Sequence, residues 1–123
     1  MLSKLILPEI EELLNKKKFA AIRDVIQDIE VADIAEIISD MDESKQALFL
    51  RLLPKNLAAD IFEYFDSEQQ ISLIEKMSNA EVASILNEMD PDDRTTLLEE
   101  VPAVMAKRLI NLLNNKKKEV ALP

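Results

Sequence analysis

The sequence contains no glycine, cysteine, histidine or tryptophan among its 123 residues. Without cysteine and histidine it has no disulfides, no thiol or histidine catalysis and no Cys/His zinc site. A metal ion would find only oxygen ligands, which favours Mg²⁺ or Ca²⁺. Without glycine it lacks the usual residue of tight β-hairpins and of phosphate-cradling loops. Aromatic residues make up only 4%, so we expect an all-α fold with an aliphatic core.

Basic charge is also scarce, and the formal net charge is −9. Residues 31–100 carry 17 acidic and 5 basic side chains, a net charge of −12 in that segment. Nucleic acid and anionic lipid surfaces both need a basic face, so we expect no nucleic-acid partner and no direct membrane contact. No apolar run approaches the ~18 residues of a membrane span, and no signal peptide is recognisable. We therefore expect a cytoplasmic location.

A twelve-residue repeat organises most of the chain. From residue 31 the sequence divides without gaps into seven blocks of twelve, and alternate blocks resemble one another most, so the deeper period is 24. Odd blocks are apolar at positions four, seven, eight and eleven, which is one face of a helix. Each block ends in a residue that caps or interrupts helices, and four of these residues are predicted N-caps. They are Asp42, Asp66, Ser78 and Asp90.

Helices this short are unstable alone and persist only by packing on their neighbours. We therefore predict a right- or left-handed superhelix of short stacked helical hairpins, with about nine to ten helices. Residues 1–30 are expected to supply capping helices, at roughly 8–15 and 19–29. Residues 31–114 form the repeats, and residues 115–123 form a basic tail or linker. All of these parts belong to one domain.

The densest acidic segment is NEMDPDDR, which contains Glu88, Asp90, Asp92 and Asp93. As structure, Asp90 would cap a helix, and Asp93 would complete a capping box and stabilise the positive helix end. As function, clustered carboxylates without basic partners would be relieved by a divalent cation. Asp92, next to the cap and pointing outward, is the best ligand on that interpretation. Such an open site would bind Mg²⁺ weakly in the isolated domain.

Three segments, ADIAEIISDMD, LFLRLLPKNLAADIFEYFD and LNEMDPDDRTTLLEEVP, resemble the N-terminal cytosolic domain of MgtE-type magnesium transporters. The resemblance runs from about residue 13 to residue 113. A looser similarity extends to the middle domain of the flagellar motor switch protein FliG. In the MgtE family the superhelical domain precedes two CBS domains, a plug helix and a dimeric transmembrane pore in the plasma membrane. The resemblance therefore implies CBS and pore domains as partners in a full-length homodimer.

The resemblance also implies a regulatory role. In that family, Mg²⁺ bound between acidic faces of the N and CBS domains holds the pore closed. By position, Asp60 and Asp92 fall where the family places these ligands; Asp93 is a third candidate, and Asp90 and Glu88 are weaker ones. Thr96 stands where some relatives have a further acidic ligand, so one charge is missing here.

Two functions follow as hypotheses. The first is a Mg²⁺-sensing regulatory domain of a magnesium transporter. The alternative is an acidic α-solenoid that binds proteins, similar to the flagellar switch, with no role for metal. Catalysis is not expected, because carboxylate pairs such as Glu99 and Glu100 have no partner base and no obvious cleft to shift their pKa values.

Overall fold

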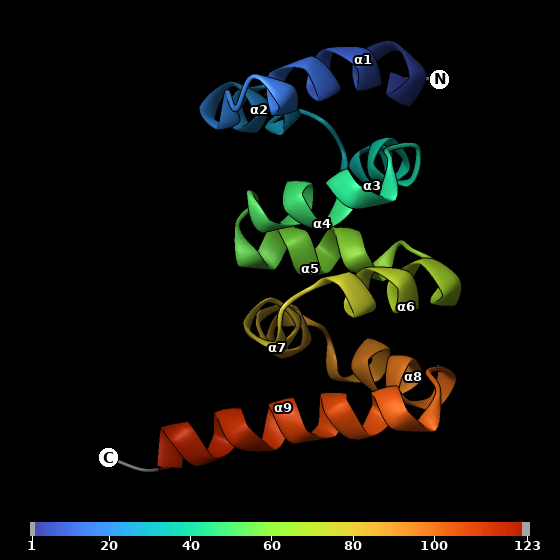
Figure 1. The fold of residues 1–123 in the computed structure, drawn as a ribbon, viewed down its shortest axis with the longest axis vertical. Helices are drawn as coiled ribbons and strands as arrows, with labels where there is room; N and C mark the ends of the chain where they lie inside the picture. Colours follow the sequence, from blue (N-terminus) through green and yellow to red (C-terminus); the bar gives the residue numbers. More distant parts are fainter. Residues whose placement is uncertain (1, 122–123) are drawn as a thin grey trace.

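The structure is a computed structural model that describes the backbone of residues 2–121 and the side chains of residues 4–113. The described range contains nine helices and no strand, which confirms the all-α prediction. Successive helices stack from the N-terminal to the C-terminal end (Figure 1). They are α1 (Leu2–Asn15), α2 (Phe19–Ile26), α3 (Val31–Ser39), α4 (Glu43–Arg51), α5 (Lys55–Glu63), α6 (Ser67–Lys76), α7 (Asn79–Glu88), α8 (Pro91–Glu100) and α9 (Ala103–Ala121).

The seven helices from α3 to α9 begin at the first residue of the seven sequence blocks. Six of these starts follow Asp, Ser or Pro, residues that favour the N-cap position or cannot extend the preceding helix. Helix α3 instead follows Glu30, which makes no capping hydrogen bond. Asp66 and Ser78 form complete capping boxes with Gln69 and Glu81. Asp42 is also an N-cap residue, but its side chain accepts no capping hydrogen bond. The twelve-residue period is therefore the spacing of helix starts.

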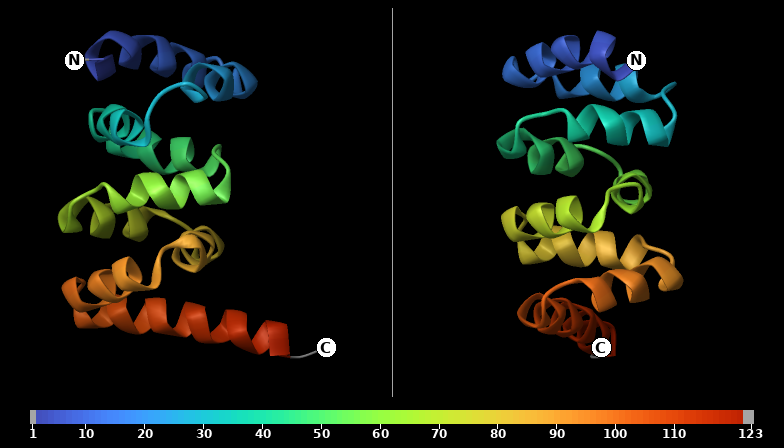
Figure 2. Two further views of the ribbon diagram at one scale, coloured as in Figure 1. Left: turned by 180° about the vertical axis from the view of Figure 1, so that it is seen from behind. Right: turned by 90° about the vertical axis from the view of Figure 1, so that its right-hand side faces the viewer.

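The deeper period of 24 corresponds to two environments. The odd-numbered helices α1, α3, α5, α7 and α9 pack on one another in sequence, and α4 packs on α6. Figure 2 shows this alternation from two further sides. An odd helix is enclosed by neighbours above and below, so α3 buries Ile34, Ala35, Ile37 and Ile38. In α8 only Leu97 is buried. The apolar stripes join into a single core from Ile10 to Leu109.

A repeated hydrogen bond ties each even helix to the odd helix before it. The fourth residue of α4, α6 and α8 is polar, and its side chain donates to a backbone carbonyl eight residues earlier, at the end of the preceding helix. This bond satisfies carbonyls that a helix terminus leaves without an intrahelical partner. Gln70, the donor in α6, is only 8% exposed. The three pairs are Gln46–Ile38, Gln70–Phe62 and Arg94–Leu86, at 2.9, 2.9 and 3.1 Å.

The first two helices differ from their predicted bounds. Helix α1 begins at Leu2 rather than near Pro8, and it contains that proline in its interior. It extends this far because Ile6 and Leu7 pack against the core, and this burial outweighs the loss of one helical hydrogen bond at proline. Helix α2 ends at Ile26. Between them, Lys17 has a φ of 58°, a left-handed conformation that glycine would adopt without strain.

Candidate metal centre

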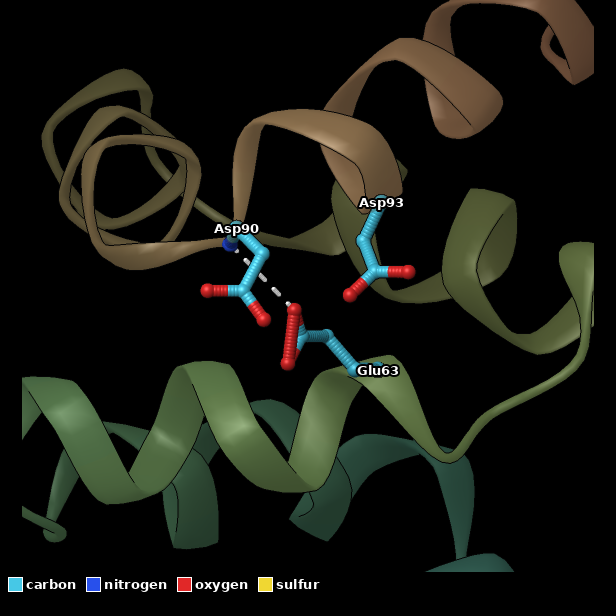
Figure 3. Close-up of side chains that lie close together, drawn as sticks. All are labelled: Glu63, Asp90 and Asp93. Carbon is cyan, nitrogen blue, oxygen red and sulfur yellow. Dashed lines mark hydrogen bonds between the residues drawn. The ribbon is translucent and has the colours of Figure 1, made fainter.

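Three carboxylates meet where the end of α5 faces the start of α8. Glu63 is the last residue of α5, Asp90 is the N-cap residue of α8 and Asp93 lies in the first turn of α8. Their side chains point toward one another (Figure 3), and one carboxylate oxygen from each lies within 4.8 Å of the others. The backbone N–H of Asp90 donates to Oε2 of Glu63 over 3.4 Å. No basic side chain belongs to this group of ligand atoms, so the three acidic groups crowd one another without a counter-charge among the described side chains.

This arrangement overturns one prediction. Asp90 is the N-cap residue of α8, as predicted, but its side chain makes no capping hydrogen bond, and the predicted capping box between Asp90 and Asp93 is wrong. The carboxylates of both residues are directed toward Glu63 instead of toward the backbone of their own helix (Figure 3). They still lie at the positive end of α8, where the helix dipole favours negative charge.

In α4 and α6 the third residue makes a favourable contact with the helix three places earlier in the chain. The third residue of α4, Lys45, forms an ion pair at 3.9 Å with Glu11 of α1, one turn before Asn15, the repeat counterpart of Glu63. The third residue of α6, Gln69, donates a 2.8 Å hydrogen bond to Ser39 of α3. The third residue of α8 is Asp93, and it meets the carboxylate of Glu63. The fold thus brings two acidic groups together at a contact that joins Gln69 and Ser39 by a hydrogen bond in the preceding repeat.

The titration of Glu63 reflects this crowding. Burial raises the pKa of Glu63 most, and a hydrogen bond with Asp93 and the negative charges of Asp93 and Asp90 raise it further. The hydrogen bond from the Asp90 backbone opposes these effects, and the pKa moves from 4.5 to about 7. At neutral pH, Glu63 is therefore partly protonated, and the proton offsets part of the repulsion. A cation at the same place would act in the same direction.

The donor set suits a hard divalent cation. Oxygen ligands are those that Mg²⁺ and Ca²⁺ prefer, and two oxygens on opposite sides of Mg²⁺ lie about 4.2 Å apart. Adjacent oxygens on Mg²⁺ lie about 3 Å apart, so carboxylate oxygens within 4.8 Å of one another would share an ion after the side chains draw together. Mg²⁺ keeps several waters and takes one or two carboxylates from a surface site. Glu63, Asp90 and Asp93 could therefore hold the ion, and this geometry leaves room for further ligands.

The other candidate ligands do not join this cluster. Asp60 is exposed on α5, one turn before Glu63 and on the same side of that helix. Asp92 is exposed in the first turn of α8, and Glu88 is exposed at the end of α7. None of the three belongs to a close group of ligand atoms among the described side chains. The hydroxyl of Thr96 donates to the backbone oxygen of Asp92 over 3.0 Å.

Glu63 is the residue that the sequence did not reveal. It lies 30 residues before Asp93, and nothing in a twelve-residue pattern says that these two positions meet. Its counterparts in the repeat, Ser39 and Asn87, are uncharged, and their side chains donate to the carbonyls of their own helices. The one signal in the sequence is that Glu63 is the single acidic residue at this position of the 24-residue repeat.

Comparison with known proteins identifies the family. No curated protein matches the chain significantly, and none of the described helices is long and apolar enough to cross a membrane. A family model described as the MgtE intracellular N domain matches residues 29–122. The match covers the repeats and confirms the resemblance seen in the sequence. It is a family of transporter domains and not a catalytic one. The chain therefore belongs to the MgtE intracellular N domains, the N-terminal regulatory domains of magnesium transporters.

Proposed function

We propose that this domain senses Mg²⁺ for its transporter, with Glu63, Asp90 and Asp93 as the residues that hold the ion. The observation that carries the proposal is the meeting of Glu63 and Asp93 at a contact where the preceding repeat places the hydrogen bond between Gln69 and Ser39. A divalent cation converts this repulsive contact between α5 and α8 into an attractive one. Binding is therefore coupled to the packing of these helices.

The neighbouring acidic residues extend the site toward a partner. Asp60 and Asp92 are exposed beside the cluster, and Mg²⁺ takes few carboxylates from any one surface. The domain alone then binds the ion weakly, and a second acidic surface increases the affinity. In the full-length protein the CBS domains supply that surface, the compact assembly holds the pore closed, and loss of Mg²⁺ releases this domain.

A titration of the chain with MgCl₂ at constant ionic strength tests the site. We expect amide shifts in heteronuclear NMR spectra to be largest at the end of α5 and the start of α8, and to be reduced in Glu63→Gln and Asp93→Asn. Glu99→Gln is the matched control, because Glu99 is an exposed acidic residue of α8 outside the cluster. Shifts of equal size at all exposed acidic residues would instead indicate a diffuse ion atmosphere.

A test of the proposed regulatory role requires the CBS domains as well as this chain. Purified CBS domains of the same transporter should bind the chain in Mg²⁺ and release it in EDTA. Asp60→Asn and Asp92→Asn should weaken this binding more than they weaken Mg²⁺ binding by the isolated chain. If the CBS domains bind equally well in Mg²⁺ and in EDTA, the alternative hypothesis is favoured, in which the domain is an acidic α-solenoid that binds proteins without a role for metal.

A further inference from the structure

An open groove of about 320 Å³ lies between the α4–α5 turn and the side of α7. Its apolar lining includes Leu50, Leu53, Met77 and Ile85, all of them members of the core. This volume is at the lower end of those that ligands fill, about 300–1,000 Å³. The groove is separate from the acidic cluster, since it shares no lining residue with Glu63, Asp90 or Asp93.

The repeat explains why the groove is open. On α9, the positions that correspond to the α7 side of the groove include Met105, which packs against the core, and Arg108. Arg108 reaches across to the carbonyls of Ile74 and Met77, at 3.0 and 3.1 Å. These two residues are the repeat counterparts of Leu50 and Leu53.

Helix α7 has smaller or polar residues at the same positions. Glu81 replaces Met105 and Ser84 replaces Arg108. On α5, the counterpart of Glu81 is Leu57, which also packs against the core. In the flanking repeats, the side chains of Leu57 and Met105 thus fill the position that Glu81 has on α7. The groove beside Glu81 therefore has room for an apolar side chain of similar size from another molecule.

The rim of the groove is basic, although the surrounding repeats are acidic. It carries Arg51 and Lys55 against a single carboxylate, Glu81. Arg51 pairs with Glu81 at 3.4 Å. Of the five cationic side chains described in residues 31–100, Lys55 is the one without an ion pair or hydrogen bond. An occupant with a carboxylate would supply the missing partner.

We infer that this groove docks a helical segment of a partner protein, which inserts a leucine or methionine side chain and places a carboxylate on Lys55. Amphipathic helices bind hydrophobic grooves in this way, with anchors spaced by three or four residues. The inference does not depend on the proposed Mg²⁺ site, because the groove residues and the cluster residues are different.

Selection from a library of displayed 16-residue helical peptides, carried out in EDTA, tests this inference. The wild-type chain is the target, and Ser84→Arg, which fills the groove as Arg108 fills its counterpart, is the counter-selection. We expect enriched peptides to carry Leu or Met with Asp or Glu three or four residues away. Fluorescence polarisation should show that Ser84→Arg weakens binding at least tenfold and that Lys55→Gln weakens it about two- to fivefold.

The controls separate groove filling from charge. Ser44→Arg adds the same side chain on the exposed first turn of α4, outside the groove, and should bind as wild type does. If attraction of an acidic peptide to added positive charge were sufficient, both arginine variants would bind more tightly, and the inference would be wrong. Enrichment of basic peptides, or equal binding to wild type and Ser84→Arg, would also overturn it. Ala80→Leu, which fills the groove from a neighbouring position, replaces Ser84→Arg if that variant does not fold.

Discussion

Replacement of Glu63 by glutamine should remove a pH-dependent weakness from the domain. The pKa of Glu63 is raised from 4.5 to about 7 by burial and by Asp93 and Asp90, so its folded-state pKa lies above its unfolded value. The stability that this group contributes is fully present below about pH 4.5 and is lost as pH rises through 7. The amide introduced by Glu63→Gln carries no charge and can donate to Asp93, as Gln69 donates to Ser39 in the preceding repeat.

The magnitude follows from the shift and from solvent screening. A change from 4.5 to about 7 corresponds to about 3 kcal/mol between the two protonation states, and screening at this partly exposed site reduces it to about 1 kcal/mol. Glu63→Gln should therefore match wild type at pH 4.5 and exceed it by about 1 kcal/mol at pH 8. For a domain of this size, that is roughly 3–6 °C in Tm.

Urea denaturation followed by circular dichroism from pH 4.5 to 8 measures this difference, with Glu99→Gln as the control for loss of one surface charge. Saturating MgCl₂ at pH 8 should stabilise wild type more than Glu63→Gln, because only wild type has the full repulsion to relieve. If wild type and Glu63→Gln lose stability in parallel as pH rises, the carboxylates do not interact as described. The site would then lose its electrostatic basis.

Three further predictions concern the repeat itself. Gln70→Ala should destabilise the domain by about 2 kcal/mol, because it removes a buried hydrogen bond and packing volume. The control Gln27→Ala, at an exposed position, should change the free energy of unfolding by less than about 0.5 kcal/mol, and urea denaturation compares the two variants. Asp66→Ala should lower stability by about 1 kcal/mol through loss of its capping box, and Asp42→Ala, which loses no capping bond, should have a smaller effect in the same assay. Lys17→Gly should raise Tm, with a gain of about 0.5–1 kcal/mol, because glycine adopts a φ of 58° without strain; an unchanged Tm would mean that lysine is not strained there.

The unequal behaviour of the four N-cap residues illustrates what sequence can and cannot predict. All four begin a helix where the block pattern places them. Only Asp66 and Ser78 form capping boxes, because the side-chain oxygens of their third helical residues, Gln69 and Glu81, accept a hydrogen bond from the N–H of the cap residue. The third residue of α8, Asp93, contacts Glu63 of α5 instead of the backbone of its own cap residue. A contact with another helix therefore decides the orientation of a side chain that local preference alone would assign to the cap.

The sequence by itself determined the all-α class, the starts of the seven helices α3 to α9, the apolar face of the repeats and the concentration of negative charge in them. These features depend on the 3.6-residue helical period and on residues within a few positions of one another. The tertiary structure decided that Glu63 meets Asp93 and that Ser84 leaves a groove beside Lys55. Both outcomes depend on how each helix is rotated and shifted on the one stacked against it, which is set by side-chain packing across 24 to 30 residues of sequence. A period read along the chain contains no information on that rotation.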